Sequence, residues 1–264
     1  MTTPKNVPLR LEFSVELPGT PEQVWDAIAT ANGITSWFLP TDVDEREGGA
    51  IVVHMGETDS PGTITGWDPP RRLEYSEPEW AALTGHDVDS VTPLVTEFLV
   101  EAQSGGTCVV RVTSSAFGTG ADWEREFFAG MEKHWLPFFD HLHLYLTHFP
   151  GQRVTSLSVS AEVPGTVGTV WSAMRQALDA EEAGQPVKVR DLTGQVERIG
   201  QEQLLVRLTD PVPGFLAFFA HDKGDGSATA TLEGYLFSAD APAYVERERP
   251  AWHAWLQNLA PSTS

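Results

Sequence analysis

The sequence of 264 residues has a single cysteine and no long hydrophobic run. Cys108 cannot form a disulfide within the chain, as is typical of proteins in a reducing compartment. No stretch reaches the roughly 20 apolar residues that cross a bilayer, and residues 1–10 lack the apolar region of a signal peptide. We therefore expect a cytoplasmic protein without a membrane partner.

Basic side chains are also scarce. The chain has 17 Lys and Arg against 37 Asp and Glu, a formal net charge of −20, and residues 1–150 hold 23 acidic but only 8 basic side chains. This charge repels phosphate backbones and anionic lipids, which excludes nucleic acids and membrane surfaces as partners. A solubilising surface explains the charge, and a cationic partner is the alternative.

The motifs of common catalytic and metal sites are missing. There is no Gly-x-Ser-x-Gly elbow, phosphate-binding glycine loop, dinucleotide fingerprint or zinc-spaced cysteine set. His134, His141 and His148 recur every seven residues, which in a helix separates neighbours by about 10 Å, too far to bind one ion. We expect these histidines to be solvated or to flank the core, and we predict no metal, no cofactor and no catalytic residue.

Cys108 and the segment 77–92 are the remaining candidates for catalytic chemistry, and the sequence shows weak support for both. Cys108 begins the strand CVVRVTS without a nearby base in the sequence, and we interpret it as a buried core cysteine. The segment 77–92 is acidic and irregular, and we interpret it as a solvated loop, with a lid at a cavity mouth as the alternative. His86 with Asp87 or Asp89 is the one acid/base constellation that the sequence offers.

An internal repeat is the strongest pattern in the chain. Residues 11–28 match residues 157–174 at nine of 18 positions without a gap. Both segments read as a strand with alternating apolar residues, a Pro-Gly turn and a helix that a threonine caps, Thr20 in the first copy and Thr166 in the second. Gln23 is placed to complete a capping box with Thr20. The repeat predicts two copies of one α+β unit.

The two copies are unequal in length. The first continues with a meander of strands and an amphipathic helix over 121–149. The second ends with a hairpin over 214–237 and a helix, but between 180 and 193 it lacks counterparts of Trp37-Phe38 and of a double glycine. We therefore predict a complete domain over 1–149, a linker over 150–153 and an abbreviated domain over 154–264.

Four segments of the first copy resemble a known family. They are PEQVWDAIATANGITSWF, the pair Gly48-Gly49, GTITGWDPPRRLEYS and EKHWLPFFDHLHLYL. They resemble the START-like or SRPBCC superfamily and, within it, the bacterial subfamily named after the activator of the ninety-kilodalton heat-shock-protein ATPase, over residues 9–149. The resemblance implies tandem helix-grip domains of the α+β class, in which a curved antiparallel sheet wraps around a long C-terminal helix and encloses a cavity.

The resemblance also implies a function. Nine tryptophans are many for this length, and flat aromatic side chains suit flat apolar ligands. We expect the first domain to bind a hydrophobic, aromatic or lipid-like small molecule, and the second to serve as its pseudo-dimer partner within the chain. The predicted ligand contacts are Trp37, Phe38, Trp67, Tyr75, Phe98, Val110, Val112, Trp123, Phe127, Met131 and Trp135.

Two other functions stay open. Some superfamily members are polyketide aromatase/cyclases, which work by shape and a few polar groups, and a hydrolase-like reaction belongs to the same class of alternative. The name of the subfamily suggests a chaperone-regulating module instead. A wholly apolar cavity wall would argue against turnover, and the sequence favours such a wall.

Overall fold

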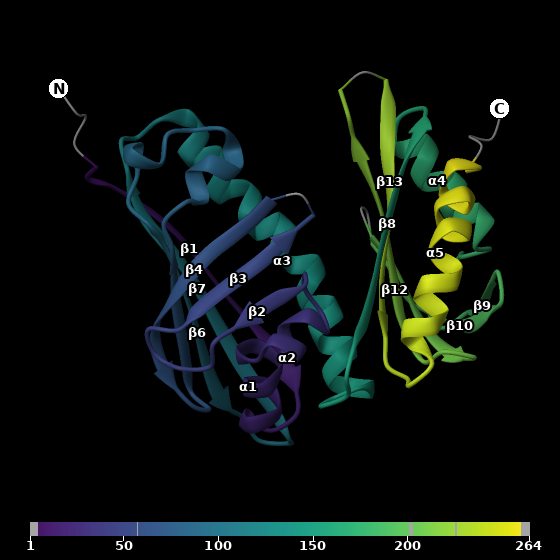
Figure 1. Cartoon of the computed structure of the whole chain (residues 1–264), viewed down its shortest axis with the longest axis horizontal. Coiled ribbons are helices and arrows are strands. Elements are labelled where there is room, and N and C mark those ends of the chain that lie inside the picture. The colour runs from purple at the N-terminus through teal and green to yellow at the C-terminus, as the bar shows by residue number, and fades with distance from the viewer. Residues whose placement is uncertain (1–4, 57, 201–202, 225, 260–264) are drawn as a thin grey trace. The chain divides into compact units, whose positions relative to one another are not determined.

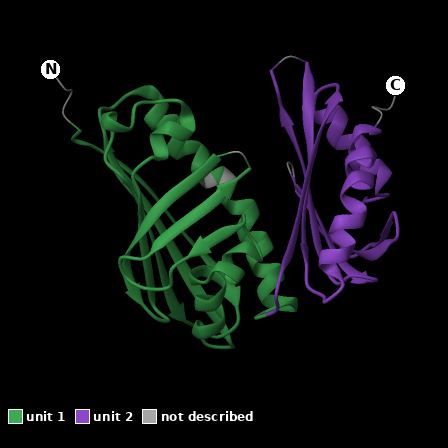
Figure 2. Ribbon diagram, in the orientation of Figure 1, with its two compact units in different colours: residues 1–151 green, residues 152–264 purple. Residues whose placement is uncertain are grey.

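The computed structural model describes residues 5–56, 58–200, 203–224 and 226–259, without the side chains at 132 and 134. The chain forms two compact units, residues 1–151 and 152–264, shown in Figure 2. The division falls within the expected linker 150–153. Each unit is an α+β domain with one antiparallel sheet, and the predicted fold class is confirmed.

The first unit has a seven-stranded sheet in the order β1-β7-β6-β5-β4-β3-β2 (Figure 1). All neighbouring strands are antiparallel, with a register shift in β4 between Ile64 and Gly66. The strands are β1 (Val7–Pro18), β2 (Thr41–Val43), β3 (Ala50–Met55), β4 (Thr58–Asp68), β5 (Arg72–Glu77), β6 (Leu94–Ala102) and β7 (Thr107–Gly118).

The helices of this unit are α1 (Pro21–Ala29), α2 (Ala31–Thr35) and α3 (Asp122–His148), with two 3-10 turns, η1 (Trp80–Thr84) and η2 (Val88–Ser90). The predicted capping box at the start of α1 is confirmed: the Thr20 N–H donates to Gln23 Oε1 at 2.9 Å, and the Gln23 N–H donates to Thr20 Oγ1 at 3.4 Å. These two bonds satisfy amides that the first turn leaves without helical partners. They fix where the chain leaves β1 and enters α1.

The helix α3 lies along the concave face of the sheet (Figure 1). Its apolar side includes Phe128, Met131 and Phe139, all buried. Phe139 packs edge-on against Phe13 of β1, with 5.3 Å between ring centroids. Since the sheet has one apolar face and α3 one apolar side, each needs the other to leave water.

His141 departs from the expectation that the helix histidines are solvated or flank the core. It is fully buried, and its Nδ1 donates to the carbonyl oxygen of Trp37 at 3.1 Å. Position 141 lies next to Leu142 on the buried side of α3, so the polar ring is inside and linked to the end of the α2 segment. Burial lowers the pKa of His141 to about 3, against the opposing effect of the Trp37 bond. The side chain of His134 lies outside the described residues.

The second unit repeats this architecture with one strand fewer. Its sheet has the order β8-β13-β12-β11-β10-β9, with α4 and α5 on one face (Figure 1). Within the described residues no counterpart of α2 or β2 is present, which confirms the abbreviation. The elements are β8 (Thr155–Pro164), α4 (Val167–Ala177), β9 (Pro186–Val189), β10 (Leu192–Ile199), β11 (Gln203–Asp210), β12 (Gly214–Asp222), β13 (Ser227–Leu236) and α5 (Ala241–Gln257).

The interior of the second unit is packed. One apolar cluster joins the sheet to α4 and α5, and it includes Phe218 and the fully buried Trp252. The β9–β10 turn is attached to α5 through Arg190, whose Nη2 donates to Glu248 Oε2 at 2.6 Å and whose guanidinium lies 5.1 Å from the ring centroid of Trp252. Large side chains therefore occupy the space between sheet and helix.

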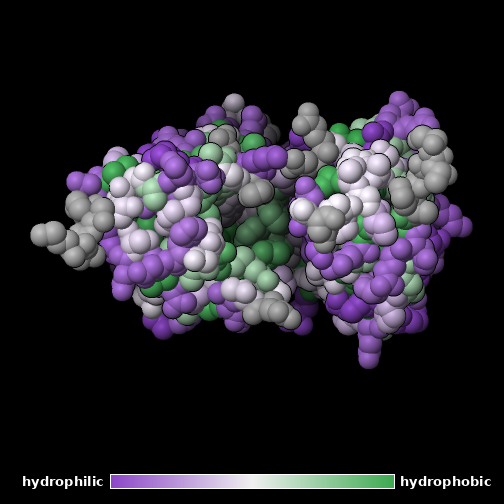
Figure 3. All heavy atoms as spheres, turned by 90° about the horizontal axis from the view of Figure 1, so that it is seen from above, coloured by the Kyte–Doolittle hydropathy of each residue, from purple (hydrophilic) through white to green (hydrophobic). Residues whose placement is uncertain are grey.

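The surface drawn in Figure 3 is largely hydrophilic in both units. None of the helices in the described part of the chain is both long and apolar enough to cross a membrane.

The buried His141 makes the stability of the first unit depend on pH. Below about pH 6.5 the unfolded chain binds a proton at this residue, whereas the folded state stays neutral until about pH 3. The contribution is therefore complete above pH 6.5 and is lost as pH falls, by on the order of 5 kcal/mol over the whole window. Urea unfolding of the wild type and of His141→Gln at pH 7.5 and 5 measures this, and the variant should show the smaller loss. Equal losses in both proteins would contradict it.

Candidate ligand-binding site

A cavity of about 450 Å³ opens between α3 and the sheet of the first unit, and we call it the outer cavity. Its volume lies within the range of about 300–1,000 Å³ that small-molecule sites occupy. The strands supply Met55, Glu77, Leu94 and Thr96 to its wall, and α3 supplies Glu126, Phe127, Gly130, Met131 and Trp135. Most of this wall is apolar.

The turn η1 closes one side of the outer cavity with Trp80, Leu83 and Thr84. Trp80 is buried, its indole N–H donates to the Thr92 carbonyl at 2.9 Å, and its ring lies 4.8 Å from that of Phe127. The interpretation of 77–92 as a solvated acidic loop is therefore wrong at Trp80 and Ala81, which are buried. The apolar run Trp-Ala-Ala-Leu at 80–83 could have indicated this burial from the sequence, because a fully solvated loop rarely has four consecutive apolar residues.

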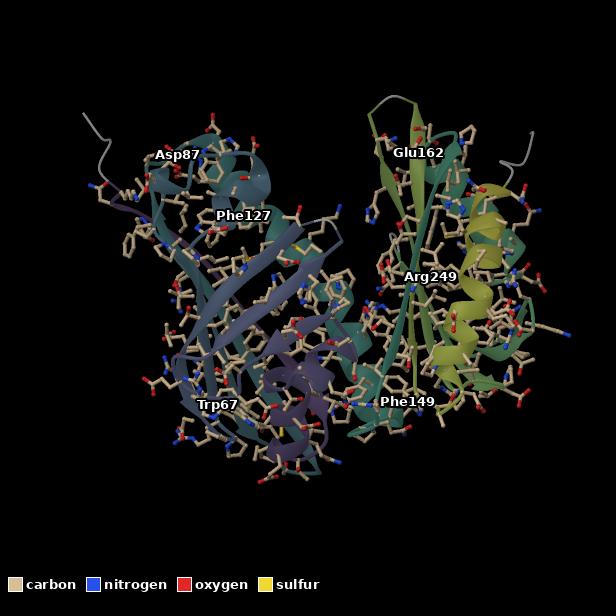
Figure 4. The ribbon with its side chains drawn as sticks, viewed as in Figure 1. Trp67, Asp87, Phe127, Phe149, Glu162 and Arg249 are labelled. Atoms are coloured by element: carbon tan, nitrogen blue, oxygen red, sulfur yellow. The ribbon has the colours of Figure 1, made fainter. Side chains whose placement is uncertain are left out.

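The second half of this segment does remain at the surface, with Asp87 at its outer edge in Figure 4. His86 stacks on Trp123 with 4.1 Å between ring centroids, and its Nδ1 is 3.0 Å from Thr84 Oγ1. Asp87 instead accepts the N–H of Asp89 at 2.9 Å. In the described structure no hydrogen bond joins His86 to either aspartate, so the acid/base constellation is not assembled.

Trp135 separates the outer cavity from a much smaller inner space. Its ring stacks on Phe38 with centroids 5.5 Å apart and contacts Phe98 at 6.0 Å. The inner space holds only about 20 Å³, room for one water molecule. Ring packing thus fills the deep part of the helix-grip interior, and the room for a ligand lies on the η1 side of Trp135.

The structure distributes the predicted contact residues over three places. Phe127, Met131 and Trp135 line the outer cavity, while Trp37, Phe38, Tyr75 and Phe98, with Trp135, line the inner space. The remaining four line neither space: Val110 and Val112 are buried on β7, Trp123 stacks on His86, and Trp67 packs edge-on against Trp25. In Figure 4 Trp67 and Phe127 lie at opposite ends of the unit. Contact of any of these residues with a ligand stays a prediction.

A polar row crosses the concave face, which the sequence had favoured as wholly apolar. Ser60 of β4 donates to Glu77 Oε1 at 2.7 Å, Tyr75 hydrogen-bonds Thr96, and Thr96 Oγ1 is 3.1 Å from Ser114 Oγ of β7. Glu77 and Thr96 reach the wall of the outer cavity. Strand alternation was the missed signal, because Glu77 shares its face with Tyr75, and Thr96 shares its face with Phe98.

Glu77 has an unusual electrostatic environment. Burial raises the pKa of its carboxyl group, and the Ser60 hydrogen bond acts against that effect. No ion pair reaches it from the described residues, and none of the residues that line the outer cavity is Lys, Arg or His. The wall therefore contains a desolvated acid without a counter-charge.

Cys108 is fully buried, and its Sγ donates to the Gly19 carbonyl at 3.4 Å. Burial raises the pKa of the thiol, which disfavours the nucleophilic thiolate. Its interpretation as a core cysteine is confirmed. Among the described residues no group of three or more His, Cys, Asp or Glu side chains is arranged to hold a metal ion.

Residues 18–147 match the family described as Activator of Hsp90 ATPase homolog 1-like protein. No curated protein matches the sequence.

Three solved structures illustrate what the chain is similar to. The di-domain ARO/CYC BexL from the BE-7585A biosynthetic pathway is 13% identical, with a TM-score of 0.45 over 94% of this chain and 95% of that one. Protein MLL2253 from Mesorhizobium loti is 18% identical, with a TM-score of 0.46 over 53% of this chain and 98% of its own. The Aha1 dimer from Colwellia psychrerythraea is 18% identical, with a TM-score of 0.42 over 52% of this chain and 96% of that one.

The role of Trp80 in closing the cavity is testable by two substitutions. Trp80→Phe keeps most of the ring but loses the bond to Thr92, at a cost of about 1 kcal/mol. Trp80→Ala also leaves a void, at a cost of about 3–5 kcal/mol. Urea unfolding measures both, and partial proteolysis should cut the segment 78–92 faster in Trp80→Ala. Leu83→Ala, at an exposed side chain of the same turn, is the control and should change stability little. Equal effects of all three would refute the assignment.

Proposed function

We propose that the first unit, in which residues 18–147 match the family described as Activator of Hsp90 ATPase homolog 1-like protein, is a small-molecule-binding domain that holds a hydrophobic ligand in the outer cavity. The observation that carries the proposal is the cavity itself, about 450 Å³ with a mainly apolar wall. The apolar side chains that line an open space of this kind are exposed to water, which is unfavourable roughly in proportion to their apolar area. A hydrophobic ligand of matching shape covers that area.

The opening of the outer cavity supports the same function. Met55, at the end of β3, and Leu83, in η1, are among the exposed large apolar side chains of the unit, and both line the cavity. Apolar side chains at a mouth reduce the cost of drawing a hydrophobic molecule out of water. Met side chains also adapt to ligands of different outline.

We propose a different role for the second unit, as the partner of the first within one chain. The packed cluster around Trp252 supports a structural role over ligand binding.

Native mass spectrometry of the purified full chain tests the ligand proposal. We expect one bound small molecule per chain, which is lost or strongly reduced in Trp135→Ala because that ring forms the floor of the outer cavity. The matched control is Leu136→Ala, the next residue of α3, which is exposed and lines neither space. Two ligands per chain, or equal retention by both variants, would contradict the proposal.

Aromatase/cyclase-like catalysis is the second candidate, and the polar row favours it. Glu77 and Thr96, which line the outer cavity, offer the kind of polar groups that orient a poly-β-ketone in an otherwise apolar site. The test is incubation of the full chain with a linear poly-β-ketone thioester and analysis of the products by mass spectrometry. Loss of water with formation of an aromatic ring, abolished in Glu77→Gln, would support catalysis, whereas an unchanged thioester would exclude it for that substrate.

A further inference from the structure

Glu77 on the concave face of the first unit's sheet has different surroundings from Glu74 and Glu97 on the outer face. On the outer face, Arg72 binds Glu97 through Nε at 2.6 Å and Glu74 through Nη2, so these carboxylates have a cationic partner. On the concave face, Glu77 has only the hydroxyl of Ser60, at Oε1. Among the described residues none donates a hydrogen bond to its Oε2. Within the described part of the chain, the acid on the cavity side therefore has a hydroxyl partner but no counter-ion.

A carboxylate in this position is costly unless something compensates it. Taking an ionised group out of water is unfavourable, and neutral hydrogen bonds recover only a part of the lost hydration. An arginine or lysine in the wall would have removed the cost, but the wall contains none within the described structure. A second acid, Glu126, lines the same cavity from α3, where it is exposed. The ionisable side chains of the wall, Glu77 and Glu126, are therefore both acidic.

The aromatic rings of the wall favour the opposite sign in the ligand. Trp80, Phe127 and Trp135 surround the space that Glu77 borders. The face of an aromatic ring carries a negative quadrupole, which attracts ammonium groups and does so most strongly where water is excluded. Rings together with a carboxylate are the usual recognition site of amines and quaternary ammonium ions. The overall charge of −20 draws such ions toward the protein.

We propose that the ligand of the outer cavity is a hydrophobic cation, a flat apolar body that carries a protonated amine or quaternary ammonium group, and that Glu77 binds this group. The inference rests on the proposed ligand-binding function and names the chemical class of its ligand. Thr96, next in the polar row, faces the same space and suits a hydroxyl group of the ligand. The alternative ligand is a neutral hydrophobic molecule that forms hydrogen bonds with the polar row but no ion pair with Glu77.

Three probes of one shape and different charge separate these occupants. Calorimetric titration of the full chain at pH 7.5 uses 2-naphthylmethylamine, 2-naphthylmethanol and 2-naphthoate. We expect the wild type to bind the amine at least tenfold more tightly than the alcohol and to bind the carboxylate least. In Glu77→Gln we expect the amine to lose at least tenfold in affinity while the alcohol stays within threefold.

Glu79→Gln is the matched control, because it removes the same charge two residues away at an exposed position outside the cavity wall. It should leave the affinity for the amine within threefold of the wild type. An equal loss in both variants would mean that the general negative field attracts the amine, and would overturn the role of Glu77. Urea unfolding shows that each variant is folded. Should Glu77→Gln fail this check, Glu77→Asp replaces it, which keeps the charge but shortens the side chain and should weaken binding of the amine more than Glu79→Gln does.

The remaining outcomes separate this inference from the proposed function. Equal or tighter binding of the alcohol by the wild type overturns the cationic ligand but leaves the cavity as a binding site. Failure of the amine to bind also overturns it, and the mass of a co-purifying molecule then shows whether the cavity holds another ligand. If nothing co-purifies and no probe binds, the proposed function fails with it.

Discussion

The packing of α3 along the concave face of the seven-stranded sheet is the contact on which the rest of the first unit depends. It gives the apolar side chains of both elements a common interior, as the edge-on pair Phe13 and Phe139 illustrates. The contact is tight beside α1 and α2, where His141 reaches the Trp37 carbonyl, and it is open on the η1 side of Trp135. One helix thereby forms a packed core at one end and a cavity wall at the other.

The sequence was sufficient for the parts of the fold that local chemistry decides. Strand alternation, the Thr20 capping box and the nine matches of the repeat identified the unit and its duplication, because each depends on neighbouring residues. The site was harder. Residue type placed Trp67 and Trp123 at the cavity, but where a ring lies depends on the distant residues it packs against, Trp25 and His86 in these cases.

Two errors have the same physical origin. His141 and Glu77 were assigned by their usual preference for water, although helix and strand geometry put both on inward faces. The backbone of a helix or strand fixes the direction in which each side chain points. The preference of a residue type for water is only an average over many proteins, and one hydrogen bond can offset it. Trp80 shows the reverse case, in which acidic neighbours concealed an apolar run. At such positions periodicity is the more reliable guide.

The hydroxyl groups of the polar row add a property that neither its charge nor its shape provides. Ser114, Thr96 and Tyr75 each can donate and accept, and either partner of the Ser114–Thr96 pair can be the donor. Rotating the hydroxyl hydrogens reverses the direction of the chain of bonds without moving a heavy atom. Thr96, the member of this chain of bonds that lines the outer cavity, can thus offer a ligand a proton or a lone pair, and its partner Ser114 lies two strands away from Glu77.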